Sequence, residues 1–194
     1  MPTTIVLVRH DETDWNRENR FQGHADTLLN EGGREQARDL ARALGGERLS
    51  AVYSSPLLRA LETARIVAAP HALDIRRSDR LQEVDVGSWS GLTRAEVKAR
   101  FPEGYRRWRE YGHGWDDGET YAELGERVVG DLVEIAARHG DEVVLAVTHG
   151  GPIRSALAAA SGVPFGQARR SIAVLENCAT VRVAVRNGVL EAVE

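Results

Sequence analysis

Three short runs of apolar residues most constrain the fold of this chain. They are TTIVLVRH (residues 3–10), AVYSS (51–55) and EVVLAVT (142–148). Continuous apolar runs of this length, rich in β-branched residues, are typical of strands that are buried on both faces of a parallel sheet. Segments with helical periodicity lie between them. This alternation predicts an α/β fold, a three-layer α/β/α sandwich with a mostly parallel central sheet.

The remaining elements follow from periodicity and turn chemistry. Helices are predicted over residues 29–46, 56–69, 93–101, 120–140 and 151–162. The first has apolar residues at helical spacing, and Thr93 with Glu96 forms a capping-box pattern at the third. A further strand is predicted around 73–77, and residues 11–30 have no clear period and are predicted to be loop. Alternating residues on both sides of Asn187-Gly188 predict a terminal hairpin, hence a possible antiparallel edge to the sheet.

Composition limits the class of protein. The chain has 194 residues, of which 42% are hydrophobic and 28% charged, which fits one domain over 1–194. A formal net charge of −4 gives no electrostatic basis for binding nucleic acid. No secretory signal or membrane-length apolar window is present, so a cytoplasmic protein without a membrane partner is expected. The single cysteine, Cys178, excludes an internal disulfide, and its surroundings predict a buried position in a strand.

Polar residues follow the predicted strands. Arg9 and His10 end the first, Arg59 lies shortly after the second, and His149 follows the strand over 142–148. Glu83 lies in a loop that contains glycine and tryptophan. Because ligands in such folds bind at the carboxyl ends of the strands, these five side chains are candidates for one site.

Each of these residues also has an ordinary structural explanation. Arg59 could be a solvated helix residue paired with Glu62, Glu83 a loop carboxylate, and His149 a hydrogen-bonded histidine at a strand end. Arg9 could be a charge emerging into water. Taken together, however, two arginines, two histidines and one carboxylic acid indicate one kind of chemistry.

This set of side chains is suited to phosphoryl transfer. Arginine offers bidentate donors that match phosphate oxygens. A histidine can attack phosphorus as a covalent nucleophile, and a second histidine, if protonated, would stabilise charge on the phosphoryl oxygens. A carboxylic acid could donate a proton to the leaving oxygen and then accept one from water. The positive charge comes from the protein, so no metal and no cofactor are expected.

The sequence resembles the histidine phosphatase superfamily, also called phosphoglycerate-mutase-like. The resemblance rests on motifs that occur in the order of that family: LVRHDETDWN (7–16), FQGHADTLLNEGGREQA (21–37), SSPLLRALETA (54–64), LQEVDVGSWSGL (81–92) and VTHGGPIR (147–154). The fold that the family implies is again an α/β/α sandwich.

The resemblance also implies roles for individual residues. His10 matches the phosphorylated nucleophile, Arg9 and Arg59 the phosphate-binding arginines, His149 the second histidine and Glu83 the proton donor. Further residues match positions that bind substrate or phosphate: Asn16, Gln22, Gly23 and Gly150.

One position departs from the family pattern. Asp11 stands where the family usually has glycine. Aspartate is among the better replacements if the glycine has a positive φ. If the glycine provides space, the carboxylate lies near the phosphate and opposes a dianion; alternatively it points into solvent. The sequence predicts that Asp11→Gly improves phosphate affinity or turnover.

Within the family, the chain resembles the phosphatase branch. A mutase needs a longer segment after the Glu83 loop to shield its phosphohistidine from water, and this chain is short. The prediction is therefore a metal-independent phosphomonoester hydrolase that acts on a small phosphorylated metabolite through a phosphohistidine. The alternatives are a cofactor-dependent phosphoglycerate mutase, a non-catalytic phospholigand-binding protein and a metal hydrolase.

The segment at about 93–121 is predicted to be a helical, lid-like excursion. It is rich in aromatic residues, and Trp108, His113 and Trp115 are candidates for contact with substrate, with ordinary packing as the alternative explanation for most of its aromatics. His24 is interpreted as a residue at the pocket rim, and His71 and His139 as surface residues. The expected partner is a small phosphate ester, with a homodimer left open.

Overall fold

The computed structural model describes residues 2–173 and 175–193. Along the chain, the strands and α-helices are β1 (Thr3–Arg9), α1 (Asp14–Arg17), α2 (Glu31–Leu44), β2 (Leu49–Ser54), α3 (Leu58–Ala68), β3 (Ile75–Arg77), α4 (Arg94–Arg100), α5 (Pro102–Tyr111), α6 (Tyr121–Ala137), β4 (Val143–Thr148), α7 (Gly150–Ala160), α8 (Phe165–Ser171), β5 (Thr180–Arg186) and β6 (Val189–Ala192). Short 3₁₀ turns lie at Ala69–His71, Asp79–Leu81 and Gly87–Trp89.

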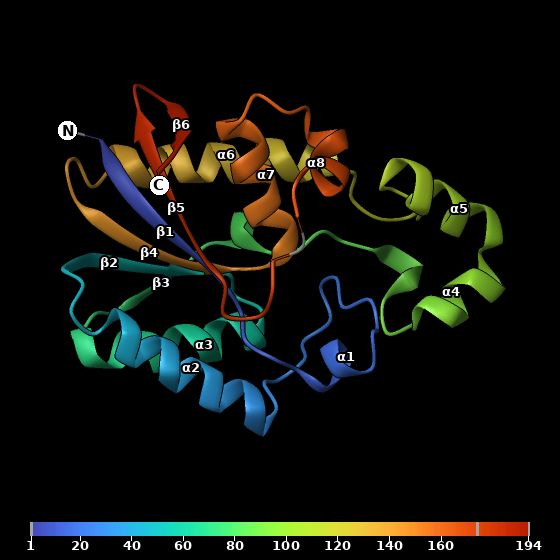
Figure 1. Ribbon diagram of the computed structural model, residues 1–194, viewed down its shortest axis with the longest axis horizontal. Coiled ribbons are helices and arrows are strands. Elements are labelled where there is room, and N and C mark those ends of the chain that lie inside the picture. The colour runs from blue at the N-terminus through green and yellow to red at the C-terminus, as the bar shows by residue number, and fades with distance from the viewer. Residues whose placement is uncertain (1, 174, 194) are drawn as a thin grey trace.

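The described strands form one mixed sheet in the order β3-β2-β4-β1-β5-β6. The pairs β3–β2, β2–β4 and β4–β1 are parallel, whereas β5 runs antiparallel to β1 and β6 antiparallel to β5. Helices α2 and α3 cover one face, and α6 and α7 cover the other (Figure 1). The predicted three-layer sandwich with an antiparallel edge is confirmed.

Alternation along β1 divides the hydrophobic core into two halves. Ile5 and Leu7 pack with apolar residues of α6 and α7, whereas Val6 and Val8 pack with those of α2 and α3. All four side chains are buried. Each contributes about 1.5–3 kcal/mol of burial energy, which explains why the run that precedes Arg9 is apolar without interruption.

The helices bury the faces that their periodicity predicts. The buried residues include Ala37, Leu40, Ala41 and Leu44 of α2 and Leu124, Val128, Leu132 and Ile135 of α6. The capping box of Thr93 and Glu96 is formed at the start of α4. The predicted hairpin is also present, because Asn187 and Gly188 adopt positive φ angles of 51° and 78° between β5 and β6.

Some local predictions were wrong. The segment predicted as loop contains α1, a single turn too short to show a period. Cys178 lies before β5 rather than in a strand, in a turn with φ 63°, and it is only half-buried. The run IAVLEN (172–177), whose apolar residues also suggest a strand, forms no strand over its described residues, and residue 174 lies outside them.

His139 is not a surface residue. Its ring is buried at the end of α6, with Nε2 3.1 Å from the Tyr53 hydroxyl and Nδ1 3.0 Å from a carboxylate oxygen of Glu142. The ring packs edge-on against Tyr53 of β2, and spacing along the chain does not reveal that contact.

Helices α4 and α5 occupy the segment predicted as an excursion, and they lie beyond the end of the sheet (Figure 1). Helix α8, which the sequence analysis did not predict, packs against α7, α6 and α5. It therefore connects the sandwich to the excursion. Among the helices of the described residues, none is long and apolar enough to cross a membrane.

Candidate active site

The carboxyl ends of β1, β4 and β2 bring distant segments together. Arg9 pairs with Thr148 across β1 and β4, and the backbone N–H of His10 donates to the Thr148 carbonyl at 2.9 Å. The following residues, His10 and His149, therefore leave the sheet side by side. Their ring centroids are 5.1 Å apart.

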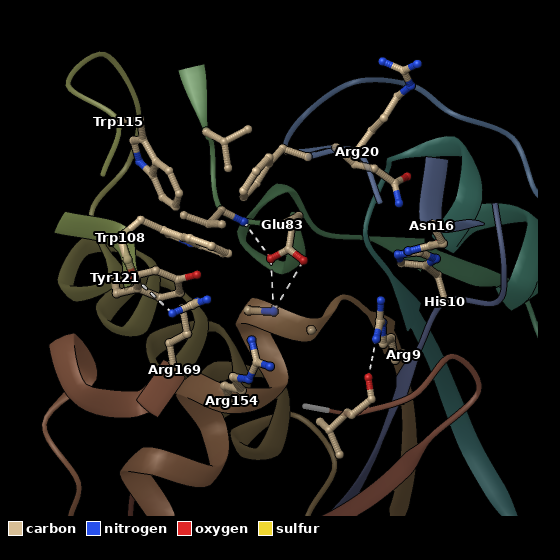
Figure 2. A pocket seen from close by; sticks show the side chains of 18 of the residues that line it. Arg9, His10, Asn16, Arg20, Glu83, Trp108, Trp115, Tyr121, Arg154 and Arg169 are labelled. Carbon is tan, nitrogen blue, oxygen red and sulfur yellow. Dashed lines mark hydrogen bonds between the residues drawn. The ribbon is translucent and has the colours of Figure 1, made fainter. Parts of the chain in front are cut away.

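A cavity of about 240 Å³ opens at this edge of the sheet (Figure 2). Ten of the residues predicted to form the site line it: Arg9, His10, Asn16, Gln22, Gly23, Arg59, Glu83, Trp108, Trp115 and Gly150. His149 lies behind His10 and is fully buried, and His113 does not line the cavity.

The imidazole of His10 is held in one tautomer. Its Nδ1 is 2.7 Å from the Asp11 carbonyl oxygen, which can only accept, so Nδ1 carries the hydrogen and Nε2 keeps its lone pair. Burial, together with the positive charges of Arg59 and Arg9, holds the pKa of His10 well below its usual value. The ring is therefore neutral near pH 7, which is the form of histidine that can act as a nucleophile.

Two guanidinium groups lie beside this ring, that of Arg59 fully buried and that of Arg9 partly buried. Arg59 does not pair with Glu62: it is fully buried, and it donates to the carbonyl oxygens of Ala25 at 2.7 Å and Gly23 at 2.8 Å. Burial lowers the pKa of Arg59 to about 10, so it stays charged. Arg9 donates to the Leu175 carbonyl (Figure 2), and burial also lowers its pKa.

Three buried nitrogen atoms at this edge lack a hydrogen-bond partner among the described residues. They are Nε of Arg9, Nε of Arg59 and Nδ1 of His149. Nε2 of His149 is 2.8 Å from the Ser55 hydroxyl, and burial with neighbouring positive charge lowers the pKa of His149 well below its usual value. Unsatisfied buried polar groups are rare and costly, so this concentration indicates a place for an acceptor.

Glu83 is held by the start of α7. Its carboxylate accepts from the N–H of Gly151 at 3.1 Å and from the N–H of Val84 at 2.9 Å (Figure 2). A Cβ on Gly151 would lie 2.3 Å from the carboxylate oxygen. A side chain at this position would displace the Glu83 carboxylate from the start of α7.

The predicted substrate side of the pocket is formed by the loop after β1. The side-chain oxygen of Asn16 accepts from the N–H of Thr13 at 3.1 Å, and that of Gln22 accepts from the Thr13 and Thr27 hydroxyls at 3.2 and 2.6 Å. With their oxygen atoms engaged, these two amides have their NH₂ groups available as donors. Gly23 has φ 51°, and its carbonyl oxygen accepts from Arg59.

The aromatic residues of the excursion have mixed roles. Trp108 and Trp115 are buried in the core and present only part of their surface to the cavity. His113 contacts the Trp115 ring, with centroids 4.9 Å apart, and does not line the cavity. The geometry thus supports packing for all three residues and cavity contact for the two tryptophans alone.

Asp11 points neither into solvent nor into the cavity. Its carboxylate is buried, where it accepts from the Thr63 hydroxyl at 3.0 Å and from the Cys178 thiol. Its φ is not positive. Burial raises the pKa of Asp11 to about 6. Direct contact with a bound dianion, one of the alternatives considered from the sequence, does not occur in this conformation.

Several residues that line the cavity were not predicted from the sequence. Tyr121, Arg154 and Arg169, from α6, α7 and α8, form its far wall (Figure 2), and Arg20 and Arg94 come from the α1–α2 loop and α4. Arg154 belongs to the motif VTHGGPIR (147–154). Surface arginines are frequent on helices, however, and the sequence spacing of the cavity arginines does not distinguish them from other surface arginines. In the described part of the chain, no group of three or more histidine, cysteine, aspartate or glutamate residues is arranged to hold a metal ion.

The fold and the cation-rich cavity define an α/β/α protein whose cavity lies at the carboxyl ends of parallel strands. The sequence profile of the histidine phosphatase superfamily (branch 1) matches residues 5–194. The chain belongs to this superfamily.

Relatives and solved structures agree with this assignment. The chain is 41% identical to phosphoserine phosphatase 1 of Hydrogenobacter thermophilus over 84% of this chain and 78% of the relative. It is 36% identical to glucosyl-3-phosphoglycerate phosphatase of Mycobacterium tuberculosis, over 82% of this chain and 76% of the relative. The solved structure of Bacillus stearothermophilus YhfR superposes with a TM-score of 0.91 at 33% identity, covering 98% of this chain and 95% of that one.

Proposed function

We propose that this protein is a metal-independent phosphomonoester hydrolase that acts on a small phosphorylated metabolite through a phosphohistidine at His10. The observation that carries the proposal is the group of buried, unpartnered nitrogens of Arg9, Arg59 and His149 around a neutral imidazole. A phosphoryl group would supply acceptors for these nitrogens and a target for Nε2 of His10. The names of the two enzyme relatives support the same class of reaction.

In the first step, the lone pair on Nε2 of His10 forms a bond to phosphorus. The bond between phosphorus and the ester oxygen breaks, and Glu83 transfers a proton to that leaving oxygen. The products are a phosphohistidine and an alcohol.

In the second step, water attacks the phosphohistidine. Glu83, now ionised, accepts a proton from the water, the bond between Nε2 and phosphorus breaks, and inorganic phosphate leaves. The two guanidinium groups stabilise charge on the phosphoryl oxygens in both steps. Because both donate to backbone carbonyl groups that hold them in place, they need little reorganisation when that charge develops.

Phosphate release in the presence of EDTA tests this proposal. We expect hydrolysis of an aryl phosphate and of 3-phosphoglycerate to continue with EDTA and to fall at least roughly 1000-fold in the His10→Ala variant. Acid-labile label from a ³²P-phosphoester should appear on the wild type and be absent from the variant.

Three other results would contradict the proposal. Transfer of phosphate between positions of 3-phosphoglycerate without release would indicate a mutase. Tight binding of phosphate esters without turnover would indicate a binding protein. Loss of activity in EDTA, with recovery on adding a divalent metal, would indicate a metal hydrolase.

A further inference from the structure

The far wall of the cavity carries positive charge that has no acidic partner. Arg154 of α7 and Arg169 of α8 point into the cavity on the side of Glu83 that lies away from His10 (Figure 2). Neither guanidinium forms an ion pair with a described carboxylate. Within the described residues, Arg154 donates to the Ala173 carbonyl at 3.4 Å, and Arg169 to the Trp108 carbonyl at 3.1 Å.

Arg20, which lines the same cavity, does have acidic partners. Arg20 pairs with Glu18 at 2.5 Å and with Glu96 at 3.3 Å, so its charge is already balanced. The arginine on one wall of the cavity is thus paired with carboxylates, whereas Arg154 and Arg169 on the far wall have no carboxylate partner among the described residues.

The uncompensated groups are close to one another and held in place. The Arg169 guanidinium lies 3.9 Å from the centroid of the Trp108 ring, a cation–π contact that fixes its direction. Burial lowers the pKa of Arg169, and the positive charges of Arg154 and Arg94 lower it further. Like charges assembled in one partly buried wall cost stability unless a ligand supplies negative charge.

A neutral donor completes the wall. The hydroxyl of Tyr121 makes no hydrogen bond with another described residue, and burial raises its pKa to about 12, so it remains protonated. Guanidinium groups beside a phenol donor are suited to bind a carboxylate, because the arginine fork matches two oxygen atoms in one plane.

We infer that the Arg154–Arg169 wall is a second anion subsite and that the protein acts on phosphomonoesters that also carry a carboxylate. The inference rests on the proposed function and names its substrate class. A cavity of about 240 Å³ holds a small ester, so both anionic groups can be bound at once only when a few atoms separate them. The phosphoryl group lies at His10 and the carboxylate at Arg154 and Arg169.

Two esters that differ only in the second group test this inference. In 3-phosphoglycerate, a carboxylate takes the place of one hydroxymethyl group of glycerol 3-phosphate. We expect the wild type to have a kcat/KM for 3-phosphoglycerate that is at least tenfold higher. Arg154→Gln and Arg169→Gln should each lower that value roughly 10- to 100-fold, mainly through KM, and change the value for glycerol 3-phosphate less than threefold.

Arg170→Gln is the matched control. Arg170 follows Arg169 on α8 but is exposed and does not line this cavity, so its substitution should change neither ester's kinetics. Because Arg169 packs on Trp108, its replacement could disturb the fold, which circular dichroism would detect. Arg154 has no such ring contact, so the Arg154→Gln variant tests the subsite independently.

The outcomes separate this inference from the proposed function. Equal hydrolysis of both esters, or equal losses on both esters in the Arg154→Gln variant, would overturn the subsite and leave the phosphatase intact. A stronger preference for 1,3-propanediol bisphosphate, lost in the same variant, would overturn the carboxylate in favour of a second phosphate. Absence of turnover on every ester would instead refute the proposed function.

Discussion

His10 shows how a single residue is prepared for its proposed role. One ring nitrogen is committed to a backbone carbonyl, and the ring is buried beside two guanidinium groups. The hydrogen bond places hydrogen on Nδ1, whereas burial and the nearby positive charges lower the pKa of the ring. Nε2 therefore stays unprotonated at the pH at which an exposed histidine begins to acquire charge.

The protonation of His10 can be measured directly. We expect a neutral His10 ring with hydrogen on Nδ1 at pH 5.5, a full unit below the ordinary histidine pKa. Two-bond ¹H–¹⁵N correlation spectra distinguish the two neutral tautomers from the imidazolium, and the His10→Ala variant assigns the signal. An imidazolium at pH 6, or hydrogen on Nε2, would contradict this account.

Asp11 is a buried carboxyl group whose charge opposes folding. Because its pKa is raised to about 6 in the folded protein, the folded state binds the proton more tightly than the unfolded state does. The free energy of unfolding should therefore fall as pH rises from about 4 to about 6, and then stay level. The full effect is about 3 kcal/mol.

Asp11→Asn should remove this dependence. We expect the variant to gain about 2 kcal/mol of stability relative to the wild type between pH 4 and pH 7.5. Urea unfolding of both proteins at the two pH values gives the comparison, in which all other titrating groups cancel. A stability difference that is the same at both pH values would show that the carboxylate is not the cause.

At the scale of elements, α6 contains two glycines with opposite surroundings. A Cβ on Gly125 would lie 2.2 Å from the Phe165 ring at the start of α8, whereas a Cβ on Gly130 would meet only the end of Arg80 at 3.8 Å. Gly125 therefore allows α8 to pack closely against α6, and Gly130 has no comparable reason to be glycine.

Alanine substitutions at these two positions should have opposite effects. Gly130→Ala should stabilise the protein by about 1 kcal/mol through helix propensity. Gly125→Ala should destabilise it by about 1–3 kcal/mol because the Phe165 ring must move. Denaturant midpoints of the two variants provide the test, and stabilisation in both would mean that α8 does not depend on this contact.

At the scale of the whole molecule, the cavity collects positive charge from both halves of the chain. Arg9 and Arg59 come from β1 and α3, and Arg154 and Arg169 come from α7 and α8. Their mutual repulsion is part of the free energy of folding, and an anion that binds only the folded state offsets it.

Inorganic phosphate should therefore raise the melting temperature more than sodium chloride of equal ionic strength. At a phosphate concentration 100 times Kd, the gain of about 2.7 kcal/mol corresponds to roughly 5–10 °C. Arg9→Gln should reduce the difference between the two salts, and Arg17→Gln, which changes an exposed residue of α1, should not. Equal shifts with both salts would indicate general screening instead of a site.

Much of this architecture can be predicted from the sequence because its signals are local. The apolar run that ends at Arg9, the capping box at Thr93 and the Asn187-Gly188 turn each depend on a few neighbouring residues, and each forms as predicted. The motifs around His10, Glu83 and His149 also indicate the family, which the comparisons confirm.

Only the tertiary structure decides which distant side chains meet. Asp11 turns towards Thr63 and Cys178, His139 contacts Tyr53, and Arg169 stacks on Trp108 within the electrostatic reach of Arg154. These contacts depend on the order of strands in the sheet and on how α8 joins the excursion to the sandwich. The sequence by itself therefore determined the elements and the family, because periodicity, turns and motifs lie within short segments. The tertiary structure determined which side chains of the site are buried, which are protonated and which residues form the far wall. The physical reason is that long-range packing sets the surroundings of each charge.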